Sequence, residues 1–252
     1  MNAQGKRSGE TAREYAYRMI REQVISLELK PGEAFNDMEF AAKIGVSRTP
    51  VREAVIQLSE ESRIIEIFPQ RGMRIAPIDV ELVEEARSLR VLLEKQIAGM
   101  CCEMATEEDI KWLQENVGLQ EFYMENSRPE MVMQLDDEMH HKLFMICHRE
   151  LTYGMCQKLA IHYDRIRSLS VNTVKDNTII EDHRKIIQFI AEHKKENAMA
   201  QMEKHLSRWQ LNEGKFRQEF PDYFRVHKES QSPLLFYRFF SFCKAFSPII
   251  NS

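Results

Sequence analysis

The sequence predicts a mainly α-helical protein, in which a small helix-turn-helix with a two-stranded β-hairpin precedes an all-helical bundle. Three observations predict this fold class. The chain has 252 residues but only 9 glycines and 8 prolines, fewer than the average share of about 12%, which indicates long helices with few interruptions. Apolar residues recur at helical spacing along most of the chain. One short segment near residue 70 alternates instead, as strands do.

The length indicates two domains, at roughly 100 to 200 residues per domain. We expect a head at residues 1–78, a helical body at 79–220 and an aromatic-rich tail of open role at 221–252. The head carries 12 basic and 11 acidic side chains, whereas the body carries 19 basic and 26 acidic ones. The body is therefore excluded as a nonspecific polyanion binder, and any contact with nucleic acid is expected from the head.

The chain shows no sign of export or membrane insertion. The first ten residues lack the apolar stretch of a signal peptide, and no run of about 18 uncharged apolar residues offers a membrane span. The five cysteines include an adjacent pair but no CxxC motif, which fits neither a disulfide framework nor a thiolate zinc site. We expect a cytoplasmic protein with reduced cysteines and no membrane partner.

In the head, periodicity predicts three helices. The first covers residues 12–27 and ends before the turn at 30–33. A short second helix follows the N-cap candidates Asn36 and Asp37 and is broken by Gly45. A third helix covers residues 47–60, and Pro50 lies in its first turn, where its missing N–H costs nothing. Two helices joined by a glycine turn form a helix-turn-helix that can enter a major groove.

The arginines of the third helix lie off its buried stripe, and a hairpin follows it. Arg48 and Arg52 fall outside the stripe of Val51, Ala54, Val55 and Leu58. Residues 65–67 and 73–75 alternate as two strands, and Arg71 lies at the tip of the hairpin between them. Gly72 supplies the positive φ that such a tip needs. This hairpin is the wing of a winged helix-turn-helix.

The head resembles the winged-helix domain of GntR-type bacterial transcription regulators. The resemblance rests on Leu29–Glu33, on the run Ala41–Ala54 that contains GVSRTPVREA, and on Pro69–Gly72. It implies contacts with bases or phosphates by Arg48 and Arg52, with phosphates by Ser47 and Thr49, and with the minor groove by Arg71 and Gly72. Arginine can read guanine O6 and N7 bidentately. Two positions depart from the family pattern: Met38 replaces a frequent arginine, and Ser62 a frequent glycine.

The body contains a set of polar residues that point inward from three predicted helices. Asp136 and His140 flank an apolar face, and their spacing of four lets both converge on one cation. Two further histidines, His183 and His205, each lie on an apolar stripe of a later helix. A divalent metal would satisfy all four groups, because buried imidazoles and carboxylates need partners. The spacing alone leaves open the alternative of ordinary core histidines.

The same residues resemble the metal-ligand pattern of the FCD effector domain in the FadR branch of GntR regulators. Asp136-x-x-x-His140, His183 and His205-Leu206 carry this resemblance over residues 79–217, together with the first-helix motif Arg90–Glu94. It implies a metal, for which one carboxylate and three imidazoles favour zinc, with nickel or manganese as alternatives. The other histidines (His141, His148, His162 and His193) are expected at the surface.

The family also implies a small carboxylate effector, held by the metal and a nearby basic group. Arg90 is the candidate for that group and Asn172 a second one, although Arg90 can instead pair with Glu94, its i,i+4 neighbour. The protein is then a homodimeric, ligand-responsive transcription regulator on a palindromic operator of double-stranded DNA. Repression is the expected sign of regulation.

Two other functions stay open from the residues. A metal-dependent hydrolytic enzyme could activate water at three histidines and an aspartate, but Glu138, the glutamate beside them, points elsewhere and leaves no evident base. The body could also be an oligomerisation module with core histidines. We expect no enzyme activity.

Overall fold

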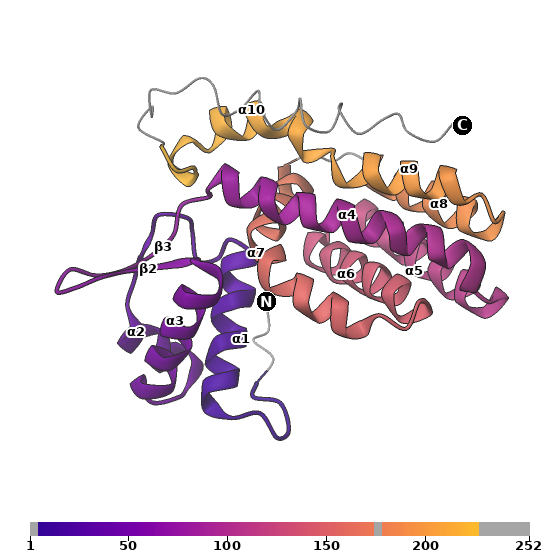
Figure 1. The fold of residues 1–252 in the computed structure, drawn as a ribbon. Helices are drawn as coiled ribbons and strands as arrows, with labels where there is room; N and C mark the ends of the chain where they lie inside the picture. Colours follow the sequence, from indigo (N-terminus) through magenta and orange to yellow (C-terminus); the bar gives the residue numbers. More distant parts are fainter. Residues whose placement is uncertain (1–4, 174–177, 227–252) are drawn as a thin grey trace, which may run out of the picture.

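The computed structural model describes residues 5–173 and 178–226, with side chains except at 172–173 and 209–212. Within these residues a small head with a β-hairpin lies beside a larger helical body (Figure 1). The expected fold class is confirmed. Most of the predicted tail, and residues 174–177, lie outside the described residues.

The three helices of the head match the predicted ones closely. Helix α1 spans Ala12–Ile25, α2 spans Asp37–Ile44 and α3 spans Arg48–Ser62. The side chain of Asn36 accepts from the first backbone N–H groups of α2 and caps it, and Gly45 ends that helix at a φ of 72°. Capping satisfies backbone donors that a helix start leaves unpaired, so these two residues fix the length of α2.

The wing is a three-stranded sheet rather than the expected hairpin alone. Strands β2 (Ile65–Phe68) and β3 (Gly72–Ile75) pair antiparallel. The two-residue strand β1 (Ala34–Phe35) adds to the other edge of β3. A strand of two residues is too short to show an alternating pattern, so the sequence does not predict β1. Gly72 has a φ of 98°, as its place in the wing turn requires.

Helices build the body. They are α4 (Val80–Met104), α5 (Glu107–Glu125), α6 (Pro129–Ile146), α7 (Glu150–Thr173), α8 (Thr178–Ala191), α9 (Lys195–Leu206) and α10 (Trp209–Glu219). Apolar side chains from α4, α5, α6, α8 and α9 form one core. Short connections separate most of these helices, at 105–106, 126–128, 147–149 and 192–194. None of the described helices is long and apolar enough to cross a membrane.

Helix α4 turns a partly polar face toward the interior. Ala86 and Ile97 are buried, but Leu89 and Leu93 between them are only partly buried. The buried face instead includes Arg90 and Glu94, while Leu92 is 69% exposed. Polar side chains replace leucines there because this face of α4 looks into a polar centre, described below.

Helix α7 joins the body to the head. Ile161 is part of the head's apolar core. His162 donates from Nε2 to the backbone oxygen of Ser62, at 2.6 Å. Arg165 is fully buried and donates to the backbone oxygen of Ala76 at 2.7 Å. His162 was expected at the surface; that prediction was wrong, because its helix packs against a second domain that a helical stripe cannot reveal.

The last described segment runs back to the junction between head and body. After the short 3₁₀ helix Pro221–Tyr223, the backbone of Ile78 donates to Tyr223 and accepts from Arg225. Phe224 is buried in a third apolar cluster with residues of α4, α7 and α10. We call Phe220–Arg225 the strap.

Candidate metal centre and DNA-reading surface

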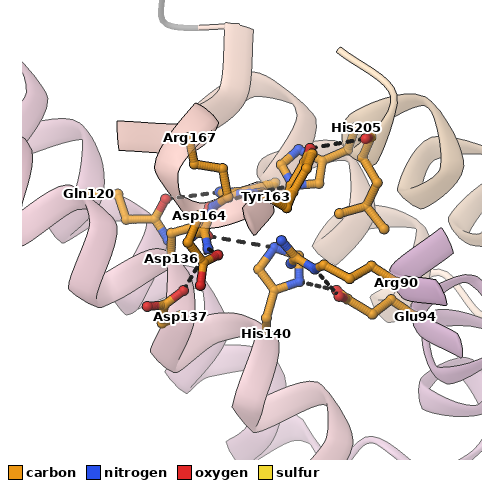
Figure 2. Close-up of polar contacts among 12 residues, drawn as sticks. Arg90, Glu94, Gln120, Asp136, Asp137, His140, Tyr163, Asp164, Arg167 and His205 are labelled. Atoms are coloured by element: carbon orange, nitrogen blue, oxygen red, sulfur yellow. Dashed lines mark hydrogen bonds and ion pairs between the residues drawn. The ribbon is translucent and has the colours of Figure 1, made fainter. Parts of the chain in front are cut away.

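Four predicted ligands meet in the body. Asp136 and His140 come from α6, His183 from α8 and His205 from α9, and all four are buried. One ligand atom of each lies within 4.8 Å of those of the others. His183 Nε2 is 3.2 Å from Asp136 Oδ1 and 3.3 Å from His205 Nε2. Figure 2 shows Asp136, His140 and His205 turned toward a common centre.

Unpaired nitrogens at this centre test whether a metal fits. Among the described residues, neither His140 Nε2 nor His205 Nδ1 has a hydrogen-bond partner. Burial, followed by the neighbouring histidines, holds the pKa of His205 well below its usual value, and burial also lowers the pKa of His183. Neutral imidazole is the form that binds metal. Buried imidazole nitrogens without partners therefore suit a divalent cation.

Gln120 determines which nitrogen of His183 carries the proton, a role that no pattern in the sequence predicts. This glutamine of α5 is fully buried. Its Nε2 donates to Asn116 Oδ1 at 2.8 Å, so its Oε1 is free to accept from His183 Nδ1 at 2.9 Å. The Nδ1–H of His183 thus faces Gln120, and the lone pair of Nε2 faces the centre. A partner of this kind raises the basicity of a metal-binding imidazole and fixes its orientation.

Glu94 takes the same position behind His140. Its Oε2 lies against His140 Nδ1, and its Oε1 accepts from Arg90 Nε at 2.6 Å. Burial alone would raise the pKa of Glu94, but Arg90 and His140 hold it at about 2. The carboxylate is therefore ionised at neutral pH and suited to orient His140. A lone i,i+4 pair of Arg90 and Glu94 was expected as an alternative; the pair exists, but it is buried.

Arg90 keeps one nitrogen without a partner. It is 6% exposed, and its guanidinium lies 5.2 Å from the ring centre of Tyr163. Among the described residues its Nη1 has no hydrogen-bond partner. Unpaired buried donors are costly, so this nitrogen is a place for an anionic group. The side chain of Asn172, the other predicted effector contact, lies outside the described residues.

Arg167 supplies the positive charge beside Asp136. Its Nη2 pairs with Asp136 Oδ2, and its Nη1 lies 2.8 Å from Asp137 and 2.7 Å from Asp164. Burial alone would raise the pKa of Asp136, but Arg167 and the histidines hold it well below its usual value. Only a weak signal for Arg167 is present in the sequence, because Asp164 and Arg167 are three apart like many surface pairs.

The predicted DNA contacts lie on the exposed side of the head. Ser47, Arg48, Thr49 and Arg52 are exposed at the start of α3, and Arg71 is exposed with Gly72 in the wing turn. The hydroxyl of Ser47 makes no capping hydrogen bond, which leaves it available. Figure 1 shows the wing hairpin projecting from the head, away from α5 and α6.

Comparison with known proteins covers both parts of the chain. Residues 12–75 match the model of the bacterial regulatory proteins of the gntR family, and residues 85–208 match the FCD domain. The HTH-type transcriptional repressor RspR of Escherichia coli is 28% identical over 209 residues, 82% of this chain and 91% of that protein. The Nta operon transcriptional regulator of Aminobacter aminovorans is 26% identical over 185 residues, 73% and 86% of the two chains.

Solved structures show the same fold. E. coli McbR/YncC aligns with a TM-score of 0.70 at 17% identity, covering 83% of this chain and 99% of that one. A protein from Rhodococcus sp. RHA1, described as a putative transcriptional regulator GntR, aligns with a TM-score of 0.66 at 16% identity and covers 79% and 96%. At these identities the likeness extends to the fold alone.

Proposed function

Because this chain belongs to the GntR family of bacterial transcription regulators and carries the family's FCD domain, we propose that it represses genes in response to a small carboxylate bound at a metal centre. That it is a ligand-sensing, DNA-binding regulator follows from the family. The sign of regulation, the metal and the chemical class of the effector are our proposal. RspR, which is 28% identical, is named a repressor, and this supports the sign.

The convergence of four buried ligands is the single observation that carries the proposal. Zinc is the metal that one carboxylate and three imidazoles suit best, with nickel or manganese as alternatives. A bound metal would neutralise the buried carboxylate and attract an anion. On a metal that accepts a fifth ligand, the anion would bind beside the protein groups and pair with Arg90 Nη1, which has no hydrogen-bond partner among the described residues.

We propose a homodimer on a palindromic operator, in which the α3 helix of each protomer enters the major groove. Half-sites are then about one helical turn apart. Arg48 and Arg52 would contact bases or phosphates, Ser47 and Thr49 phosphates, and Arg71 with Gly72 the minor groove. The effector changes operator affinity only as far as it binds the two dimer arrangements differently.

Metal content and effector binding test the proposal directly. We expect about one zinc per protomer in the wild type and in His141→Ala, and little in His140→Ala. The two histidines are adjacent, but His141 stacks on Tyr153 outside the centre, so it is a matched control. A thermal-shift screen of hydroxy acids, sugar acids and acyl compounds, with and without zinc, should find ligands that raise the melting temperature only with metal. Equal metal content in both variants would remove the proposed site.

The alternative function is a hydrolytic metalloenzyme. One observation favours it: Glu94 is an inward glutamate that is not among the four ligands. Its pKa of about 2 and its contacts with Arg90 and His140 argue against a general base, since an effective base has a pKa near the working pH. Zinc-loaded protein that hydrolyses activated esters in proportion to its zinc content, with loss in Glu94→Gln, would favour the enzyme.

A further inference from the structure

The carboxylate of Asp37 lies beneath the two arginines that begin α3. Asp37 is the first residue of α2 and is 2% exposed, whereas the side chains of Arg48 and Arg52 are 56% and 61% exposed. Arg48 donates from Nε to Asp37 Oδ1 at 3.0 Å. Arg52 Nη1 lies 3.9 Å from Asp37 Oδ2, an oxygen without a hydrogen-bond partner in the described part of the chain. One buried acid therefore faces both exposed cations.

This contact restricts two side chains that are otherwise flexible. An arginine in solution loses rotamer freedom when it binds a base, and a fixed guanidinium loses less. Because Arg48 uses Nε toward Asp37, both of its terminal nitrogens stay outside that hydrogen bond. Two parallel N–H groups are what guanine O6 and N7 or a phosphate accept. The acid thus holds the arginine without using its two terminal nitrogens.

Asp37 also has an electrostatic cost. A negative charge under a DNA-binding surface weakens the attraction of phosphates, which is the part of binding that does not depend on sequence. A residue that fixes the arginines and repels phosphates lowers affinity for random DNA while it supports the correct site. The effect of Asp37 is therefore expected in the ratio of the affinity for the operator to the affinity for random DNA.

We propose that Asp37 is a positioning residue for operator recognition, which sets the guanidinium groups of Arg48 and Arg52 and thereby raises specificity. The inference rests on the proposed role of these arginines at the operator. It assigns a function to a side chain that contacts no DNA itself.

The test measures specificity rather than affinity alone. An operator is first selected from a pool of randomised duplexes with the full-length wild type. Fluorescence anisotropy then gives the affinity of each variant for this operator and for a random duplex at several salt concentrations. We expect Asp37→Ala to weaken operator binding about tenfold, in line with the loss of one well-placed arginine contact, while random binding is unchanged or tighter. Asp37→Asn keeps a neutral acceptor for Arg48, so its operator affinity should lie between those of the wild type and Asp37→Ala.

Glu53→Ala is the matched control. Glu53 is an exposed acid next to Arg52 on α3, so its removal changes the charge of the same surface without removing the carboxylate under the arginines. It should tighten binding to both duplexes alike. If Asp37→Ala behaves as Glu53→Ala does, Asp37 acts only through its charge and the inference is overturned. Thermal melting identifies any variant that is unfolded, and the nearly isosteric Asp37→Asn then decides.

A double-mutant comparison separates this inference from the proposed function. In an Arg48→Ala, Arg52→Ala background, Asp37→Ala should leave the specificity ratio unchanged, because nothing remains to be positioned. A further fall in the ratio would assign Asp37 a role of its own and overturn the inference. If the arginine substitutions themselves leave operator binding unchanged, Arg48 and Arg52 do not contact the operator and the proposed DNA contacts are wrong. If they abolish it while Asp37→Ala keeps the ratio, only the positioning role fails.

Discussion

The proton on one histidine shows how the proposed metal centre depends on residues outside it. The amide of Gln120 is oriented by Asn116 and accepts from His183 Nδ1. A neutral imidazole has one donor and one acceptor nitrogen, so this contact determines which nitrogen faces Asp136. The chemistry of the centre is therefore set partly on α5, which supplies no ligand.

Replacing Gln120 by leucine should weaken metal binding about 10- to 100-fold, the usual effect of losing such a partner. Competition for zinc with a chromophoric chelator measures it. Gln114→Leu is the control, because Gln114 is exposed on the same helix. Equal zinc affinity in the two variants would show that Gln120 does not set the tautomer of His183.

The sequence predicted the four candidate ligands, which the structure brings together, but not the groups that support them. Asp136 and His140 are visible because their spacing of four matches the turn of one helix, and His183 and His205 because each interrupts an apolar stripe. Gln120 and Arg167 each act across the bundle, more than 25 residues from the ligand they contact. Local periodicity carries no information on such distant partners, so only the folded structure shows them.

At the scale of one element, α7 has two functional faces. Ile161 and His162 contact the head, while Tyr163 and Arg167 reach the polar centre. A helix turns by about 100° per residue, so neighbouring residues serve opposite sides. A shift of α7 on ligand binding would therefore alter its contacts with the head, and this helix touches both the head and the polar centre.

His162 should make the junction of head and body sensitive to acid. Burial lowers the pKa of His162 from 6.5 to about 4, against the opposing effect of its hydrogen bond to Ser62. Between pH 6.5 and 4 the unfolded chain binds a proton there that the folded chain does not. Stability thus falls as the pH falls through this window and is fully present above it. At pH 4 this effect lowers the free energy of unfolding by about 2 to 3 kcal/mol.

Urea unfolding of the wild type and of His162→Gln at pH 7.5 and 5.0 tests this expectation. The variant should lose less stability on acidification than the wild type, because glutamine does not titrate. His148→Gln is the control, since His148 is exposed. An identical pH dependence in wild type and His162→Gln would place the acid sensitivity elsewhere, for example at the histidines of the metal centre.

At the scale of the whole molecule, the strap ties the end of the described chain to the head. Arg225 lies 2.7 Å from Glu66 of strand β2 and 3.0 Å from Asp79, the N-cap of α4. Phe224 is buried, and its ring lies 5.1 Å from the guanidinium of Arg217. The strap therefore joins the wing, α10 and the linker, which is the segment 76–79 between β3 and α4. Sequence composition indicated an aromatic tail from residue 221, but it did not indicate where residues 221–225 pack.

Two truncations test the strap. A chain ending at Val226 keeps it, whereas a chain ending at Glu219 lacks Phe224 and Arg225. Burial of a phenylalanine side chain contributes about 1.5 to 3 kcal/mol, so we expect the shorter chain to unfold more easily by about that amount. Urea unfolding measures the difference, and protease sensitivity at the linker near Ile78 should rise with it. Equal stability of the two chains would show that the packing of the strap does not stabilise the folded protein.

The head's dependence on Ile161 bears on attempts to recombine regulators. Its apolar core is completed by this side chain from a helix that begins more than 70 residues after the head ends. A hybrid that grafts residues 1–78 onto a foreign sensor leaves a hole where Ile161 packed, and such vacancies cost several kcal/mol. Engineers who exchange sensing modules should therefore transfer residues 161–165 of α7 together with the head.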